Sequence, residues 1–147
     1  GKGDIAEWFK ERASENFYWR QDKKHLYFSR ADIDCIEIEP DLRATLKGKS
    51  LRVVHDDFLT YDTAKRYDLI FMNPPFSNGD KHLLKAIALQ ERYGGMVVCI
   101  LNAETIRNPF SNTRKALANQ LAKYGAKIEF TRMFFRLKMR KERRERI

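Results

Sequence analysis

The sequence predicts an α/β fold in which a doubly wound sheet of mostly parallel strands carries helices on both faces. Short apolar runs bounded by turn residues alternate with segments whose apolar residues recur at helical spacing, as in consecutive βαβ units. Polar residues directly follow several of these runs, and open sheets of this kind bind their ligands at the carboxyl ends of the strands. We therefore expect one domain over residues 1–147 with a ligand site at that edge.

The composition indicates a globular protein with an anionic partner. Hydrophobic residues make up 43% of the chain and charged residues 33%, and the formal net charge is +9. Such a positive charge favours nucleic acid as the partner. Because no apolar segment has the length of a membrane span and no signal-peptide pattern opens the chain, we expect a cytoplasmic protein without membrane contact.

The two cysteines are expected to be small buried hydrophobic residues. Cys35 and Cys99 both lie in apolar, strand-like runs, Ile33–Ile38 and Met96–Leu101. Such positions are typical of neither a disulfide nor a metal ligand. We therefore expect a reducing compartment and no metal.

The chain opens with a glycine-containing loop that leads into a helix. Apolar residues recur at helical spacing within residues 5–13. Gly1 and Gly3 let the backbone approach a ligand closely, beside the free N–H groups of the helix. The pattern Gly1-x-Gly3-x-x-Ala6 also satisfies the dinucleotide fingerprint, so a nicotinamide or flavin protein stays open as an alternative.

Residues 14–30 are rich in aromatic and basic side chains without a clear period. We expect a helix end and a variable connection that packs on the sheet edge or touches nucleic acid. A strand over residues 33–40 follows and stops at Pro40. Glu37, near its tip, is placed to accept hydrogen bonds from both ribose hydroxyls of a nucleoside, and an exposed strand-end glutamate is the alternative.

Two carboxylates follow the next predicted strand. A short helix over Asp41–Leu46 leads into the strand Leu51–Val54, after which Asp56 and Asp57 stand side by side. Because consecutive strand residues face opposite ways, we do not expect these two carboxylates to chelate a metal together.

The most informative stretch is Asp68–Phe76, in which a short apolar run ends in Asn73-Pro74-Pro75-Phe76. Two consecutive prolines do not extend a strand, so the chain must leave the sheet in a stiff, extended turn. Asn73 offers a neutral acceptor and Phe76 a flat ring, which together suit a planar substrate with an exocyclic amine. Prolines that merely end a strand are the alternative interpretation.

The remaining chain continues the alternation of helices and strands. Ser77–Asp80 is expected as a flexible polar turn and a candidate lid, and His82 as a solvated or capping residue that begins an amphipathic helix. Asn108–Phe110 repeats Asn-Pro-Phe without the doubled proline, and we interpret it as a decoy. Further expected elements are the strand Met96–Leu101, the helix Thr113–Lys123 with a C-cap at Gly125, and the strand Ala126–Phe130. The tail over Arg136–Ile147 is basic, and we expect it either to contact phosphates or to form a solvated helix.

At residues 73–76 the sequence resembles the amino-methyltransferases that use S-adenosylmethionine, because it fits their signature (Asn/Asp/Ser)-Pro-Pro-(Tyr/Phe/Trp) at all four positions. The resemblance implies a Rossmann-like class I methyltransferase domain, S-adenosylmethionine as cofactor, and catalytic roles for Asn73, Pro74, Pro75 and Phe76. The chain departs from the family pattern in two places. The first strand of that pattern, which would lie in mid-sheet, is missing, and the terminal antiparallel hairpin is incomplete.

The same resemblance implies which residues contact the cofactor. They are Gly1, Gly3 and Asp4 around the methionine part, Glu37 at the ribose, Ile38 over the adenine face, Asp57 and Phe58 at the adenine edge, and Asn73. Asp56 is the second choice for the place of Asp57.

The function implied is methyl transfer to the N6 amino group of adenine in DNA, as in restriction–modification. The alternatives are adenine N6 or guanine N2 in RNA, a glutamine side chain in a protein, and an inactive relative that binds S-adenosylmethionine or nucleic acid. Only fifteen residues separate Asp57 from Asn73. We therefore expect that any target-recognition domain precedes residue 1, follows residue 147 or belongs to a partner chain.

Overall fold

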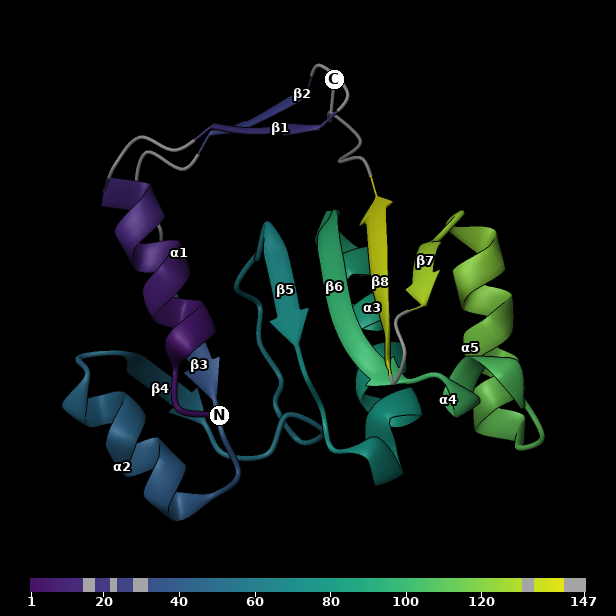
Figure 1. The fold of residues 1–147 in the computed structure, drawn as a ribbon, viewed down its shortest axis with the longest axis horizontal. Helices are drawn as coiled ribbons and strands as arrows, with labels where there is room; N and C mark the ends of the chain where they lie inside the picture. The colour runs from purple at the N-terminus through teal and green to yellow at the C-terminus, as the bar shows by residue number, and fades with distance from the viewer. Residues whose placement is uncertain (15–17, 22–23, 28–31, 131–133, 142–147) are drawn as a thin grey trace. The chain divides into compact units, whose positions relative to one another are not determined.

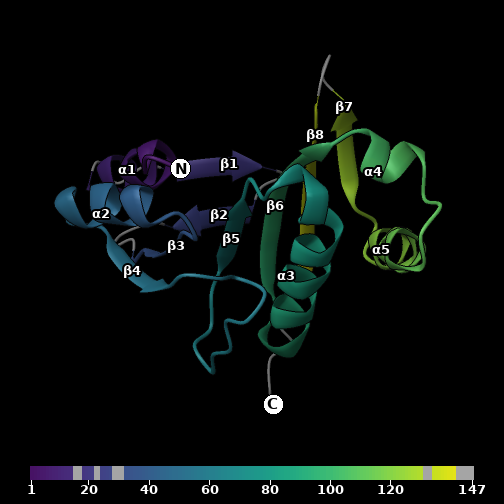
Figure 2. The same ribbon diagram turned by 90° about the horizontal axis from the view of Figure 1, so that it is seen from below.

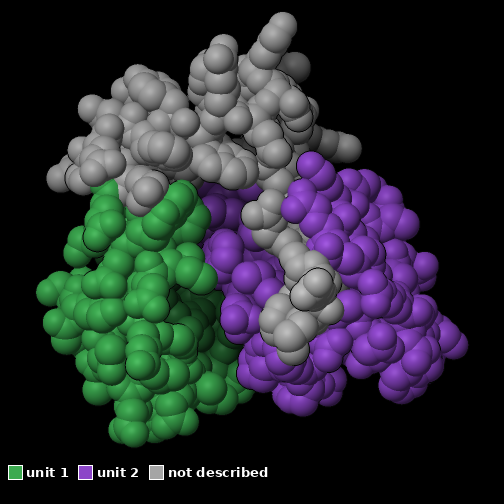
Figure 3. Space-filling view, in the orientation of Figure 1, with its two compact units in different colours: residues 1–62 green, residues 63–147 purple. Residues whose placement is uncertain are grey.

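The computed structural model describes residues 1–14, 18–21, 24–27, 32–130 and 134–141, with side chains in 1–11 and 32–130 (Figure 1). The chain divides into two compact units, residues 1–62 and 63–147, coloured green and purple in Figure 3. The single domain expected from the sequence remains a prediction. Within the described ranges, no helix combines the length and the apolar character that a membrane crossing requires.

Unit 1 contains two helices and two pairs of strands in its described residues. Helix α1 (Asp4–Ser14) precedes an antiparallel pair, β1 (Tyr18–Gln21) and β2 (Lys24–Tyr27). Strand β3 (Asp34–Ile36), helix α2 (Pro40–Gly48) and strand β4 (Arg52–His55) follow. Because β3 and β4 are parallel and α2 connects them, this part is a βαβ unit of the predicted kind.

The prediction for residues 14–30 is only partly correct. Helix α1 ends at Ser14 as expected, but β1 and β2 form a hairpin where the sequence predicts an irregular connection. Residues 15–17, 22–23 and 28–31 lie outside the described residues, as do the side chains of the hairpin. The proposed contact of these side chains with the sheet edge or with nucleic acid therefore stays a prediction.

Unit 2 is built on a four-stranded sheet with the order β5-β6-β8-β7. Strands β5 (Leu69–Met72) and β6 (Gly95–Asn102) are parallel, and β8 (Phe134–Lys141) is antiparallel both to β6 and to β7 (Lys127–Phe130). It follows that β5, β6 and β7 run in one direction. Their carboxyl ends therefore lie at the same edge of the sheet, which is where the predicted catalytic stretch is found.

The helices of unit 2 connect these strands. The short 3₁₀ helix η1 (Phe76–Asn78) leads into α3 (Gly79–Tyr93), which packs against β6. After β6 come α4 (Glu104–Arg107) and α5 (Asn112–Lys123), and α5 packs alongside α3 (Figure 2). Helices on both faces of one doubly wound sheet remain a prediction, because the structure describes this sheet and the β3–β4 pair in separate units.

The core of unit 2 lies between α3, α5 and β6. Its fully buried side chains come from all three elements, namely Leu83 and Ile87 of α3, Val97, Cys99 and Leu101 of β6, and Leu117 of α5. Burial raises the pKa of Cys99 to about 12, as expected for a structural thiol. Cys35 in unit 1 is only half-buried, so the prediction of a buried residue holds for Cys99 alone; both thiols are free.

A buried glutamine of α3 and a glycine at the start of β6 pack tightly where the chain passes from this helix to this strand. Gln90 is buried, and its Nε2 donates a hydrogen bond to the backbone oxygen of Met96 (3.1 Å). Gly95 has a φ of +144°, and a Cβ there would lie 2.6 Å from Gln90 Nε2 and 2.7 Å from the backbone oxygen of Tyr67. Only glycine fits this turn without displacing its neighbours.

Two further expectations about unit 2 are wrong. The terminal antiparallel hairpin is not incomplete, since β7 pairs with β8 over four residues and β8 continues along the whole of β6. Residues 136–141 are thus in a strand and not in a helix. Residues 77–80 are not a flexible turn either, because η1 and the first turn of α3 occupy them. The backbone N–H of Asn78 donates to the oxygen of Pro75 and closes this turn (3.1 Å).

Candidate active site

The carboxyl edge of the β3–β4 pair gathers the acidic residues predicted to bind a nucleoside. Glu37 follows β3 directly, and Asp56 and Asp57 follow β4. In the parallel register Ile36 lies opposite His55. Glu37 and the two aspartates therefore leave the sheet at one edge, as the sequence predicts.

The Glu37 carboxylate lies against the start of the chain. Its Oε1 accepts a hydrogen bond from the backbone N–H of Glu39 (3.0 Å), and its Oε2 accepts one from the amino group of Gly1. Burial alone would raise the pKa of Glu37, but the hydrogen bonds that its carboxylate accepts outweigh it and hold the pKa below its ordinary value. The structure thus brings together two of the predicted cofactor contacts, Gly1 and Glu37.

The backbone after Glu37 is held by an arginine that sequence reasoning missed. The Nη1 of Arg43, in α2, donates to the backbone oxygens of Glu37 (3.0 Å) and Ile38 (2.6 Å). The Ile38 side chain is 61% exposed, as a residue that covers a ligand ring must be before the ligand binds. The signal available in the sequence was an arginine six residues after the acid at the end of β3, because the first turn of α2 brings Arg43 back to the end of that strand.

Asp57 organises a tight turn after β4. Its Oδ1 accepts from the backbone N–H of Leu59 (2.9 Å), and its backbone oxygen accepts from the N–H of Thr60 (3.1 Å). Phe58 is half-buried within this turn. The second choice, Asp56, accepts from the backbone N–H of Asp57 (2.8 Å), and this hydrogen bond is the main reason why the pKa of Asp56 lies below its ordinary value. Among the described residues, no three acidic, histidine or cysteine side chains converge as a metal site would require.

Gly3 and Asp4 begin α1. The backbone oxygen of Gly3 accepts from the N–H of Glu7 (2.9 Å), and a Cβ on Gly3, whose φ is +90°, would clash with Leu46 and Leu51. Asp4 forms an ion pair with Lys49 (3.5 Å), and its side chain is otherwise exposed. The predicted cofactor contact of Asp4 stays a prediction.

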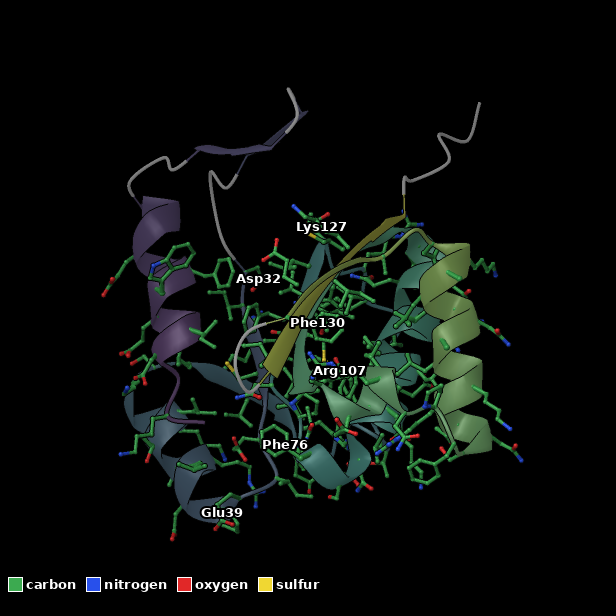
Figure 4. The ribbon with its side chains drawn as sticks, turned by 45° about the vertical axis from the view of Figure 1, so that its right-hand side comes forward. Asp32, Glu39, Phe76, Arg107, Lys127 and Phe130 are labelled. Atoms are coloured by element: carbon green, nitrogen blue, oxygen red, sulfur yellow. The ribbon has the colours of Figure 1, made fainter. Side chains whose placement is uncertain are left out.

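The stretch Asn73–Phe76 leaves the carboxyl end of β5 in unit 2. Asn73, Pro75 and Phe76 are exposed, whereas Pro74 is buried. Pro75 has φ −55° and ψ 135°, which is an extended conformation. The turn is therefore stiff and extended, as the two prolines predict, with Asn73 exposed. The Phe76 ring also lies at the surface (Figure 4).

The start of α3 fixes the far end of this stretch. A Cβ on Gly79 would lie 2.3 Å from Leu101 Cδ2 and 3.8 Å from Pro74 Cγ, so α3 begins directly against the end of β6. His82 Nδ1 donates to the backbone oxygen of Asn78 (2.8 Å). The expectation that His82 begins and caps this helix is wrong, because α3 begins at Gly79 without a side-chain cap and His82 lies within its first turn. The predicted catalytic residues and the predicted cofactor residues other than Asn73 lie in different units.

Comparison with known proteins gives one partial similarity. Over 65 residues, covering 39% of this chain, the chain is 37% identical to a tRNA1(Val) (adenine(37)-N6)-methyltransferase from Aliivibrio fischeri (strain MJ11). The chain is similar to a transfer-RNA methyltransferase. The matched part covers 28% of the length of that relative, and no family model matches the chain. The match agrees with the amino-methyltransferase resemblance of residues 73–76, and the acceptor in the name of that relative is a transfer RNA and not DNA.

Proposed function

We propose that this protein transfers a methyl group from S-adenosylmethionine to the N6 amino group of an adenine in RNA, with transfer RNA as the first candidate. The observation that carries the proposal is the stretch Asn73–Phe76 at the carboxyl end of β5, with its amide and its ring at the surface. The partial similarity to a tRNA adenine-N6 methyltransferase supports the same reaction and favours RNA as the acceptor.

Asn73 acts on the amine. The N6 nitrogen of adenine is a poor nucleophile because its lone pair is delocalised into the ring. The two N–H groups of this amine donate to the Asn73 side-chain oxygen and to the backbone oxygen of Pro74. These bonds favour a tetrahedral nitrogen, so they stabilise the transition state more than the ground state.

The bonds and protons of the reaction balance without an ionised base. When bound, S-adenosylmethionine supplies an electrophilic methyl group on a sulfonium. The N6 lone pair forms the new nitrogen–carbon bond while the sulfur–carbon bond breaks and leaves its electron pair on sulfur. The methylated amine is strongly acidic and loses its proton to water. Phe76 stacks on the base and holds it, which contributes about 1–3 kcal/mol.

The residues at the β3–β4 edge fit a nucleoside cofactor. Each carboxylate oxygen of Glu37 accepts one hydrogen bond and retains a lone pair for a ribose diol, and the exposed Ile38 offers an apolar cover for a purine ring. Asp57 keeps its second carboxylate oxygen for an exocyclic amine, since the hydrogen bond from Leu59 uses Oδ1. Gly1 and Gly3 lie at the start of α1 beside Glu37, where the methionine part would extend. In this proposal unit 1 holds the cofactor in a Rossmann-like arrangement and unit 2 holds the acceptor base.

The test is to incubate the protein and labelled S-adenosylmethionine with separate pools of transfer RNA, total RNA, DNA and protein. We expect label in RNA, and nuclease digestion should show it in N6-methyladenine. Label in DNA alone would reinstate the DNA substrate, and label in protein would point to a glutamine acceptor. If calorimetry shows binding of S-adenosylmethionine but no pool gains label, the proposal is wrong and the chain is an inactive relative.

A further inference from the structure

Three segments at the carboxyl edge of the unit 2 sheet each present an exposed phenylalanine. Phe76 follows β5, Phe110 follows β6 and α4, and Phe130 ends β7. Their exposed fractions are 51%, 68% and 47%, and in the described part of unit 2 no other large apolar side chain is as exposed. One exposed ring is ordinary, but three rings along one sheet edge make a surface that needs an explanation.

Two of these rings lie against arginine side chains. The guanidinium carbon of Arg107 lies 4.7 Å from the centre of the Phe130 ring, and that of Arg114 lies 4.7 Å from the centre of the Phe110 ring. Figure 4 shows Arg107 and Phe130 side by side. The fold brings Arg107 of α4 to Phe130 of β7, whereas Phe110 lies in the loop before α5, four residues from Arg114.

Helix α4 fixes both pairs. Arg107 is the last residue of this helix, and Arg114 donates from Nη1 to the backbone oxygens of Glu104 (3.3 Å) and Asn108 (3.2 Å). The N–H of Phe110 donates to the oxygen of Asn108 (2.9 Å), which holds this ring in a tight turn. Because a guanidinium has five N–H donors, Arg114 keeps donors for a ligand. We call Arg107, Phe110, Arg114 and Phe130 the arginine–phenylalanine edge.

The charge of unit 2 favours a polyanion at this edge. Residues 63–147 contain 18 Lys or Arg against 7 Asp or Glu, a formal net charge of +11, whereas residues 1–62 contain 11 against 13, a formal net charge of −2. The acidic residues on the elements of the edge are Glu104 and Glu129, and Glu129 is paired with Lys127 (3.5 Å). The positive excess of the whole chain therefore lies in the unit that carries the exposed rings.

The chemistry of the edge selects unpaired nucleic acid. A phenylalanine ring stacks on the face of a base, and base faces are accessible in single strands but covered in a duplex. Arginine side chains beside the rings supply donors for the phosphates between the bases. From β5 to β7 there are three strand spacings, or about 14 Å, so the edge spans only a few nucleotides.

We infer that the arginine–phenylalanine edge binds an unpaired stretch of nucleic acid next to the target adenine, with bases on Phe110 and Phe130 and phosphates on Arg107 and Arg114. This inference rests on the proposed function, since it assigns the surface that would hold the flanking nucleotides while Phe76 holds the target base. The second Asn-Pro-Phe sequence, at residues 108–110, is then a binding element and not a decoy.

Binding of a fluorescently labelled oligoribonucleotide to the full-length protein tests the edge by anisotropy. Phe110→Ala and Phe130→Ala should each weaken binding of the single strand by about tenfold. Arg107→Gln and Arg114→Gln should each reduce the slope of log Kd against log salt by about 0.7. A hairpin loop should bind better than a blunt duplex of the same length.

The pair of Arg66 and Tyr93 provides a matched control. The guanidinium carbon of Arg66 lies 5.1 Å from the centre of the Tyr93 ring. Arg66 precedes β5 and Tyr93 ends α3, so this pair lies at the opposite edge of the sheet. Arg66→Gln removes the same charge as Arg107→Gln and should leave both affinity and salt slope unchanged. Phe110 is largely exposed, and an unchanged unfolding midpoint of Phe110→Ala shows that its effect on binding is not a loss of fold.

The outcomes separate this inference from the proposed function. Loss of affinity in the four edge variants but not in Arg66→Gln supports the inference, whether or not methyl transfer is found. If transfer to RNA occurs and the edge variants keep the KM of the unaltered protein, the proposed function stands and the inference is wrong. Equal binding of duplex and single strand, or equal affinity of edge variants and control, also overturns it. Capture of a peptide in place of the oligonucleotide would assign the surface to a protein partner instead.

Discussion

The carboxyl edges of the two units differ in chemistry although both belong to parallel strands. The edge of unit 1 presents Glu37, Asp56 and Asp57 at the ends of β3 and β4. The edge of unit 2 presents a neutral amide, three phenylalanine rings and two arginines. Carboxylates suit the hydroxyls and amines of a neutral sugar and base, whereas rings and guanidinium groups suit a stacked polyanion.

Under the proposed function, this difference would divide the work between the cofactor and the acceptor. An arginine that bonded the Glu37 carboxylate would compete with the ribose that this acid is proposed to bind. Arg43 avoids this competition because it donates to the backbone oxygens of Glu37 and Ile38 and not to the carboxylate. The two edges thus keep opposite charges within one chain.

The largest expected effect comes from Asn73→Ala, which should lower kcat by about 10²–10³, as the loss of one preorganised transition-state contact does in other enzymes. The affinity for S-adenosylmethionine, measured by calorimetry, should change little, because the other predicted cofactor contacts lie in unit 1 and stay intact. Asn78→Ala, in the exposed η1 of the same stretch, is the matched control and should keep its rate. A full rate in Asn73→Ala would remove the catalytic assignment.

Glu37→Gln tests the other edge and should weaken binding of S-adenosylmethionine by about 1.5–3 kcal/mol, since hydrogen bonds to a charged acceptor are lost. The affinity for an oligoribonucleotide should stay the same. Glu39→Gln removes the same charge two residues further on, outside the predicted cofactor contacts, and serves as the control. Equal loss of cofactor affinity in both variants would mean that general charge, and not a specific contact, attracts the cofactor.

Gly95→Ala should have the smallest of the three effects and should act on stability alone. Its positive φ and the close contacts with Gln90 and Tyr67 predict a loss of about 1–3 kcal/mol in the free energy of unfolding. Gly48→Ala, in unit 1, is the control, because a Cβ there meets no atom within 4 Å. Denaturant unfolding followed by circular dichroism measures both, and an unchanged midpoint for Gly95→Ala would contradict the packing described at this turn.

Local signals in the sequence were sufficient for most elements of the fold. The apolar runs at residues 69–72 and 96–101 are strands, and the doubled proline gives the extended turn that it predicts. Glu37 and Asp57 lie at the same edge because a helix connects β3 to β4 and the two strands are therefore parallel. The alternation of strand and helix is itself visible in the local sequence.

What sequence reasoning missed depends on contacts between distant segments. The strand β8 was expected as a tail or a helix, because its basic residues suggest solvent and only the pairing with β6 and β7 makes it a strand. Arg107 and Phe130 are 23 positions apart, and no periodicity relates them. The Asn-Pro-Phe sequence at residues 108–110 looked redundant because the place of Phe110 at the edge that also holds Phe76 and Phe130 depends on how the strands pair.

The tight contact between Gly79 and Leu101 has a practical consequence for altering specificity. Before Phe76 the chain is held by the buried Pro74. After Phe76 it is held by Gly79 at the start of α3, where a Cβ would collide with Leu101. The backbone of this turn is therefore set by the interior, while the ring at position 76 projects outward. An exchange of Phe76 for Tyr or Trp should therefore change the size and polarity of the ring without moving the backbone of the turn, which makes this single position the natural starting point for redesign.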